Sequence, residues 1–163
     1  MPLTEIQVGD QTVRYDREAT AAIYARLKNG WAESCRCVGC RNLLAQRDVV
    51  YPDSFRELLN QLGIDPYKEA EAVADGPLMN GWHHYGGWFF LVGEMVTVGE
   101  RMSQAGDSPY FRYHFSRVGP CPQEFRDGPR ICIEFEAHFK WILDEGWDSE
   151  LGPAASASRR KPA

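Results

Sequence analysis

Apolar and polar side chains alternate most clearly between residues 130 and 143. One face would carry Ile131, Ile133, Phe135, Ala137, Phe139 and Trp141, and the other Cys132, Glu134, Glu136, His138 and Lys140. A period of two places successive side chains on opposite faces of a strand. The segment therefore predicts a strand with one apolar and one wet face, as in an antiparallel sheet covered on one side.

Other segments have the composition of strands. The ranges 3–8 and 11–16 flank Gly9-Asp10, a dipeptide suited to a tight hairpin turn. The ranges 88–98 and 110–118 are rich in aromatic and β-branched residues. Residues 19–28 are ambiguous, because their alanines favour a helix while Ile23, Ala25 and Leu27 alternate as in a strand. Either a helix or a third strand fits this segment.

The middle of the chain has the period of helices. Apolar residues recur at i, i+3, i+4 and i+7, namely Phe55, Leu58, Leu59 and Leu62. A helix beginning at residues 52–54 would have a capping box of Ser54 and Glu57 and would end at Gly63. Cys40 is expected to open an earlier helix, and Asp65-Pro66 a short later one.

Runs of strands interrupted by helices indicate the α+β class. We expect an antiparallel sheet with a helical insertion at about residues 38–75, which carries a cysteine cluster at its start. The 163 residues, 44% hydrophobic and 12% aromatic, suit a single α+β domain at 1–150. Residues 151–163 are rich in Gly, Pro, Ala, Ser and basic residues, so we expect a disordered tail there.

The charge balance bears on partners and location. The net charge is −5 and three of the basic residues lie at 159–161, so the body is acidic and argues against nucleic-acid or membrane-surface binding. The N-terminus lacks the pattern of a signal peptide, and the longest apolar stretch, 88–92, is too short for a membrane span. A cytoplasmic location is therefore expected, with the five cysteines present as thiols or ligands rather than disulfides.

The main chemical feature is the cluster Cys35, Cys37 and Cys40. Three thiolates from one short loop can turn towards a single ion, and zinc prefers four such ligands in a tetrahedron. The fourth would come from His83, His84, His114, Cys121 or Cys132. The His83-His84 pair is favoured because glycines flank it, so that its backbone can approach a neighbouring loop. In extended backbone the two rings point to opposite sides, so one of them would serve, and we prefer His83.

Other interpretations of the cluster remain open. Cys37 and Cys40 could act as a redox pair at a helix N-terminus, where a thiolate is stabilised. An iron–sulfur cluster would need Cys121 or Cys132 as a fourth thiolate, and a hydrolytic zinc would keep an open position for water. The cysteines could also be small buried residues without a site.

Three further features have structural explanations beside functional ones. Glu134 and Glu136 could form a carboxylate pair, but they more simply face Arg112 and His114 across neighbouring strands. His138 is expected to be solvated. The aromatic segment 82–90 could line a ligand pocket or could belong to the core.

Several segments resemble a family of small uncharacterised bacterial proteins. The likeness rests on the Cys-x-Cys-x-x-Cys-x-Asn motif at 35–42, on Leu62-Gly63-Ile64-Asp65-Pro66 and on the Tyr-Gly-Gly-Trp segment at 85–88. It spans about residues 24–98. The resemblance implies that the cysteine loop and the Tyr-Gly-Gly-Trp segment share one site, and it implies no activity.

The sequence therefore predicts a zinc-stabilised small cytoplasmic binding or interaction domain. Its predicted ligands are Cys35, Cys37, Cys40 and one of His83 and His84, with zinc in a structural role. The alternative is a thiol-redox or metal-dependent enzyme that uses Cys37 and Cys40. The partner would be an unknown protein or small molecule, not a nucleic acid or membrane, and the oligomeric state stays open.

Overall fold

The computed structural model describes residues 3–106, 110–117 and 119–149. Its strands are β1 (Thr4–Val8), β2 (Gln11–Tyr15), β3 (Glu71–Pro77), β4 (Trp82–Thr97), β5 (Ser103–Gln104), β6 (Phe111–Ser116) and β7 (Arg130–Lys140). Its helices are α1 (Arg17–Arg26), α2 (Trp31–Cys35), α3 (Val38–Val50) and α4 (Asp53–Leu62), with short 3-10 turns η1 (Met79–Gly81) and η2 (Gln123–Phe125). The predicted tail at 151–163 lies outside the described residues.

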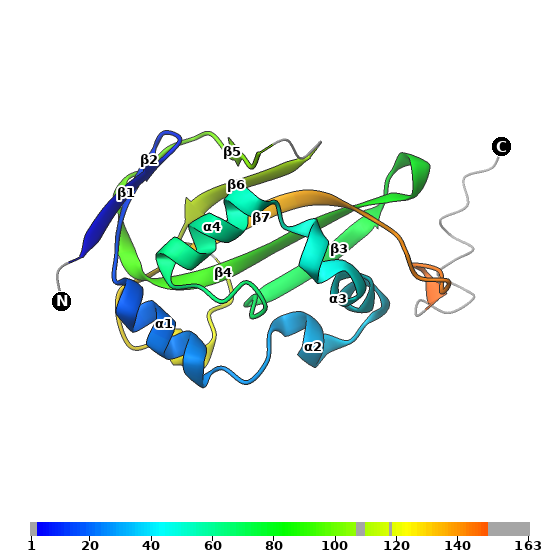
Figure 1. Cartoon of the computed structure of the whole chain (residues 1–163), viewed down its shortest axis with the longest axis horizontal. Coiled ribbons are helices and arrows are strands. Elements are labelled where there is room, and N and C mark those ends of the chain that lie inside the picture. Colours follow the sequence, from blue (N-terminus) through cyan, green and yellow to red (C-terminus); the bar gives the residue numbers. More distant parts are fainter. Residues whose placement is uncertain (1–2, 107–109, 118, 150–163) are drawn as a thin grey trace.

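The strands form one antiparallel sheet in the order β1-β2-β4-β7-β6-β5. The long strand β4 is its centre, because β7 pairs along 82–92 while β3 and β2 pair with successive stretches of β4. Helices α3 and α4 lie over the sheet, and α1 and α2 lie beside it (Figure 1). The α+β class and the antiparallel sheet with helices inserted between its strands are therefore confirmed.

An aromatic cluster forms the core between α4 and the sheet. Phe55 of α4 lies 4.7 Å from Phe111 and 6.2 Å from Phe135, ring centroid to centroid. The predicted apolar face of β7 is buried, with exposed fractions of 3% or less from Ile131 to Phe139. Burial of such side chains is the main favourable term in folding, so this cluster holds the helices on the sheet.

The opposite face of β7 is only partly exposed to solvent. Glu136 and Glu134 pair with Arg112 at 3.0 Å and His114 at 3.9 Å, which confirms the expected cross-strand partners. Cys132, predicted on the wet face, is instead fully buried. It pairs in register with Phe90, whose ring contacts Phe125 of η2, so a neighbouring loop covers this end of the face.

Several predicted boundaries were wrong. Residues 19–26 of the ambiguous range belong to helix α1, and helix α3 begins at Val38 rather than at Cys40. The helices thus start at Arg17, before the expected helical range of 38–75. Residues 71–75 of that expected range belong to strand β3. Strand β4 begins at Trp82, earlier than expected, because residues of the glycine-flanked histidine segment pair with β7.

Two local predictions around helix α4 also failed. The helix is capped by Pro52 without a side-chain hydrogen bond, so the expected Ser54–Glu57 capping box is absent, whereas Gly63 ends the helix with φ 80° as predicted. No helix follows Asp65-Pro66. The Asp65 carboxylate accepts a hydrogen bond from the Tyr67 N–H at 3.0 Å, and this local bond favours a turn over a helix.

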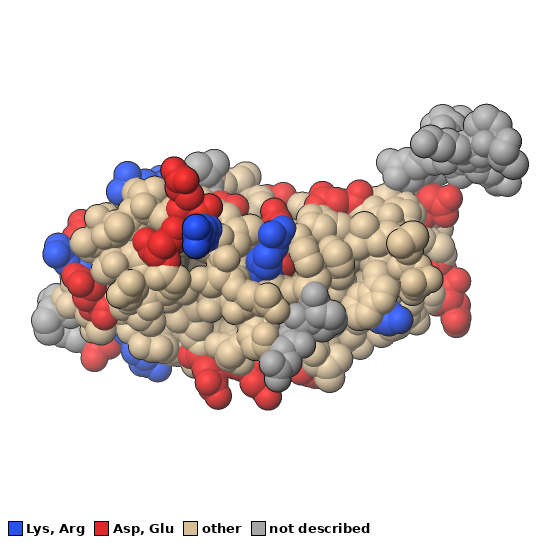
Figure 2. Space-filling model, turned by 90° about the horizontal axis from the view of Figure 1, so that it is seen from above, with Lys and Arg blue, Asp and Glu red and all other residues tan. Residues whose placement is uncertain are grey.

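The surface carries charges of both signs. Figure 2 shows that, on the part of this face formed by described residues, lysines and arginines are scattered among acidic side chains and form no continuous basic stripe. Among the described residues, no helix has the length and apolar composition needed to cross a membrane.

Candidate metal centre

The three clustered thiols meet at the corner between α2 and α3, which we call the cysteine corner (residues 35–40). Cys35 ends α2 and is exposed, Cys37 is the N-cap of α3, and Cys40 is buried in the first turn of α3. Their Sγ atoms all lie within 4.8 Å of one another. A tetrahedral zinc with Zn–S bonds of about 2.3 Å separates its sulfurs by roughly 3.8 Å, so a small adjustment brings all three onto one ion.

The backbone of the corner explains why this spacing converges. Arg36 adopts the left-handed conformation (φ 57°), which ends α2 and reverses the chain into α3. The Arg41 guanidinium donates to the Arg36 carbonyl at 2.6 Å and thereby braces the turn. The same Arg41 pairs with Glu145 at 2.6 Å. No spacing pattern in the sequence indicates this link to the segment after β7.

Gly39 lets the cysteine corner lie directly on strand β3. A Cβ atom at this position would stand 2.6 Å from the Cβ of Ala74. Carbon atoms this close repel strongly, and the Ala74 methyl group has no rotation that avoids the contact. The lack of a side chain at Gly39 therefore sets the distance between α3 and the sheet.

We expect Gly39→Ala to destabilise the protein by about 1–3 kcal/mol, the usual cost of overpacking. Alanine is the better helix former by about 1 kcal/mol, so a net loss would show that the contact with Ala74 dominates. The double variant Gly39→Ala/Ala74→Gly removes the clash and should recover most of the loss in urea denaturation. Equal stability of the wild type and Gly39→Ala would contradict this account.

A hydrogen-bonded group beneath α3 fixes the corner to the centre of the sheet. The Tyr85 hydroxyl donates to the Gly39 carbonyl at 3.0 Å and accepts from the Asn42 amide at 3.0 Å. Asn42 also donates to the Lys140 carbonyl at 3.0 Å and accepts from the Ile142 N–H at 2.9 Å. Burial raises the pKa of Tyr85, which keeps its hydroxyl protonated as a donor. The cysteine corner and the Tyr-Gly-Gly-Trp segment thus lie against each other.

The thiols lie in an environment that needs a cation if all three ionise. Burial raises the pKa of Cys40, and the neighbouring Cys37 and Cys35 raise it further. Negative thiolates at this separation repel one another, and a bound divalent cation would remove the repulsion. The N-terminus of α3 contributes partial positive charge at the same place.

The two predicted histidine ligands lie on opposite faces of the sheet, as extended backbone requires. His83 faces the helices, is 6% exposed, and packs its ring 4.5 Å from Trp141 and 6.0 Å from Trp147. Neither ring nitrogen of His83 has a hydrogen-bond partner among the described residues. Burial lowers the pKa of His83.

His84 lies on the other face, where its Nδ1 is 2.8 Å from the Asp75 carboxylate. Among the described residues, the group of ligand atoms close enough to share an ion contains the three thiols and neither histidine. The structure thus brings together three of the five predicted ligands. The fourth ligand stays a prediction.

A cavity of about 300 Å³ opens beside the cysteine corner. Its lining includes Trp31, Cys35, Cys37, Glu71, Val73 and Trp147. Trp147 also contacts His83, so that histidine lies behind one of the residues that wall the cavity. Glu71 is the one carboxylate among the lining residues. The sequence does not point to Glu71, because a single glutamate at the start of a strand carries no spacing signal.

The remaining two cysteines lie away from the corner. The Cys132 thiol contacts the Ser116 carbonyl at 3.5 Å within the sheet, and the Cys121 thiol contacts the Pro122 carbonyl at 3.3 Å in a loop. In the described part of the chain no fourth thiol joins the cluster. This arrangement does not favour an iron–sulfur cluster with four cysteines.

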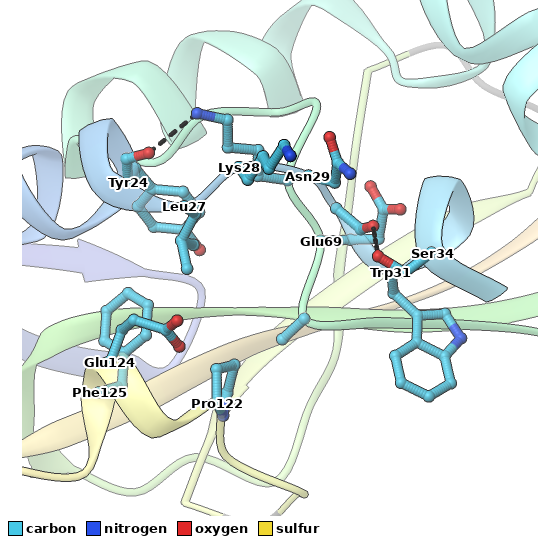
Figure 3. A pocket seen from close by; sticks show the side chains of 13 residues that line it. Tyr24, Leu27, Lys28, Asn29, Trp31, Ser34, Glu69, Pro122, Glu124 and Phe125 are labelled. Atoms are coloured by element: carbon cyan, nitrogen blue, oxygen red, sulfur yellow. Dashed lines mark hydrogen bonds between the residues drawn. The ribbon is translucent and has the colours of Figure 1, made fainter.

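A second cavity, of about 310 Å³, shares Trp31 with the first as a lining residue (Figure 3). Its two buried or half-buried charged groups serve structural contacts. The Lys68 ammonium donates to the Tyr24 carbonyl at 2.9 Å, and the Glu69 carboxylate binds Arg47 at 2.9 Å. These bonds hold α1 and α3 to the segment before β3.

Comparison of the chain with protein-family models, with curated proteins and with solved structures finds no match.

Proposed function

We propose that the protein is a zinc-stabilised binding domain whose metal is held by Cys35, Cys37 and Cys40. The observation that carries the proposal is the mutual approach of the three Sγ atoms within 4.8 Å. Thiolates select zinc over hard cations such as magnesium and calcium. A cytoplasmic location, which we also propose, would keep these thiols reduced.

Zinc would serve mainly to order the cysteine corner. All three thiols come from the junction of α2 and α3, so the ion would join these two helices. The aromatic core between α4 and the sheet supplies its own burial energy, although Cys40 belongs to the same hydrophobic cluster and Cys37 packs against it. Loss of the metal should therefore loosen the corner without unfolding the sheet.

The binding function rests on the cavity next to the thiols. Three protein thiolates leave one of the four zinc positions to another ligand. The cavity gives that ligand space, and the predicted His83, Glu71 or a bound small molecule or peptide would complete the site. The tryptophans in the lining, Trp31 and Trp147, offer apolar contact area to such a molecule.

Elemental analysis of freshly purified protein tests the proposal. We expect about one zinc per chain in the wild type and almost none in Cys37→Ser, since a serine hydroxyl is a poor zinc ligand. Cys121→Ser is the matched control and should keep its zinc, because Cys121 lies outside the cluster. Hydrogen exchange of residues 31–50 should speed up in Cys37→Ser alone. Equal metal content and exchange in all three proteins would overturn the proposal.

A second candidate function is thiol redox exchange by Cys37 and Cys40. It is favoured by their placement, with Cys37 half-buried at the N-cap of α3 and Cys40 buried one turn later. In that reaction the Cys37 thiolate would attack a substrate disulfide, and Cys40 would then displace the reduced substrate. Two thiols of the protein become one disulfide, and two electrons and two protons pass to the substrate.

Thiol titration distinguishes the two functions. A zinc site predicts slow reaction of the thiols until a chelator is added, whereas a redox pair predicts one fast thiol and ready formation of a Cys37–Cys40 disulfide. Cys35→Ser separates them further. It should reduce zinc binding strongly, and it should leave a redox pair of Cys37 and Cys40 active.

A further inference from the structure

His84 has a second histidine directly opposite it on the open face of the sheet. In the β4–β7 register His84 pairs with His138. Their ring centroids lie 5.8 Å apart, with the rings at 66° to each other. Both residues belong to long paired strands, so the separation is set by the strand ladder and not by a flexible loop.

This separation suits two imidazoles that share one ion. With metal–nitrogen bonds of about 2.0–2.1 Å, two such rings place their centroids roughly 4.5–6.5 Å apart for ligand angles between about 90° and 180°. The observed 5.8 Å falls inside that range. A small change of side-chain torsion would aim a nitrogen from each ring at the same point.

Asp75 orients the first of these rings. Its carboxylate lies 2.8 Å from Nδ1 of His84. Asp75 is the extra residue of a bulge, since the β3–β4 register shifts between Ala74 and Gly76, and a bulge re-aims a side chain out of the regular ladder. When Nδ1 donates to a carboxylate, Nε2 keeps its lone pair, which is the arrangement of a carboxylate–histidine–metal group.

Stacking orients the second ring. His138 lies face to face with Tyr110 at 3.7 Å between centroids and 20° between planes. The Tyr110 hydroxyl in turn donates to Glu136 at 3.3 Å, and Arg112 pairs with the same carboxylate. The nearby Glu136 is therefore already neutralised. The ring of His138 is held in place by these contacts.

A cavity of about 460 Å³ adjoins His138. Its lining consists of Leu78, Met79, Asn80, Trp82, Tyr110 and His138. An ion with two protein imidazoles keeps open coordination positions, and those on the His138 side face this largely apolar space. A molecule with one metal-binding group and an apolar or aromatic body fits such a site.

We propose that His84 and His138, with Asp75 behind His84, form a site for a divalent transition-metal ion such as Zn²⁺ or Ni²⁺, separate from the cysteine corner. Imidazole is a good ligand for both ions. The doubled histidine at 83–84 then has two different roles, because its rings face opposite sides of the sheet. The site does not depend on metal at the thiols.

The test is a titration of the whole chain with Ni²⁺, followed by proton NMR of the histidine rings. The chain has four histidines, so their signals can be assigned by substitution. Paramagnetic Ni²⁺ should broaden the signals of His84 and His138 first. Isothermal titration calorimetry should show a loss of affinity larger than about 100-fold for His138→Ala and about 10–100-fold for Asp75→Asn, the usual effect of an outer-shell change.

The matched control is His114→Ala, which removes an imidazole from the same face of the sheet and should leave the affinity unchanged. The zinc content of the cysteine corner should be the same in all of these variants, so the test of the histidine site is independent of the proposed zinc site at the thiols. First broadening of His83 or His114 would overturn the proposal, as would unchanged Ni²⁺ affinity in His138→Ala.

Discussion

Replacement of Glu69 by alanine should lower the free energy of unfolding by about 3–5 kcal/mol, the usual cost of removing one partner from a buried ion pair. The Glu69 side chain is fully buried and that of Arg47 is 5% exposed. Their atoms meet at 2.9 and 3.2 Å, and Glu69 also accepts the Ala32 N–H at 2.8 Å. In the variant the Arg47 guanidinium would keep Glu33 and the Tyr67 carbonyl as partners. The Ala32 N–H in the first turn of α2 would lose its acceptor.

Urea denaturation measures this loss, with Glu94→Ala as the control. Glu94 pairs with Arg14 at 3.4 Å, but both side chains are about half exposed, so its removal should change stability by less than about 1 kcal/mol. Similar effects of the two substitutions would show that burial does not strengthen the Glu69–Arg47 pair.

The Glu69 carboxylate also predicts a pH dependence. Burial raises the pKa of Glu69 more than the Arg47 guanidinium lowers it. A raised pKa means that the folded state holds the proton more tightly than the unfolded state, so stability from this group declines as pH rises from about 4 through the folded pKa. In Glu69→Gln this component is absent. The stability of wild type minus that of Glu69→Gln should therefore fall with rising pH, and a rise would contradict the sign.

The second large effect is expected for Asn42→Ala, at about 3 kcal/mol. The Asn42 side chain is fully buried and makes hydrogen bonds to Tyr85, to the Lys140 carbonyl and to the Ile142 N–H. Each buried polar group left without a partner costs about 1–3 kcal/mol, and water that enters the vacated space relieves part of that cost. Because Asn42 anchors the first turns of α3, zinc affinity at the cysteine corner should fall as well.

Gln46→Ala is the matched control for this prediction. Gln46 lies one turn further along α3 and donates to the same Lys140 carbonyl at 2.7 Å, but this bond is exposed to solvent. Its removal should change stability by less than about 1 kcal/mol. A loss from Gln46→Ala as large as that from Asn42→Ala would locate the anchor elsewhere on α3.

Local patterns in the sequence determined much of the fold. The alternation in β7 and the helical stripe in α4 each follow from a period of a few residues, and the structure has both elements. The cysteine cluster also follows from a local pattern, because its spacing of i, i+2 and i+5 brings the thiols together within one corner. Some of the failures were also local. At Asp65, a single side-chain hydrogen bond produced a turn where a proline had suggested a helix.

Only the tertiary structure decided the environment of these elements. Residues far apart along the chain become neighbours through strand register, as His84 and His138 do, and one residue of slip would exchange the faces of a strand. The buried pair of Glu69 and Arg47 and the position of Glu71 in the wall of the cavity beside the thiols arise in the same way. Sequence spacing specifies which side chains can converge within one turn, whereas convergence between elements depends on how the helices pack on the sheet.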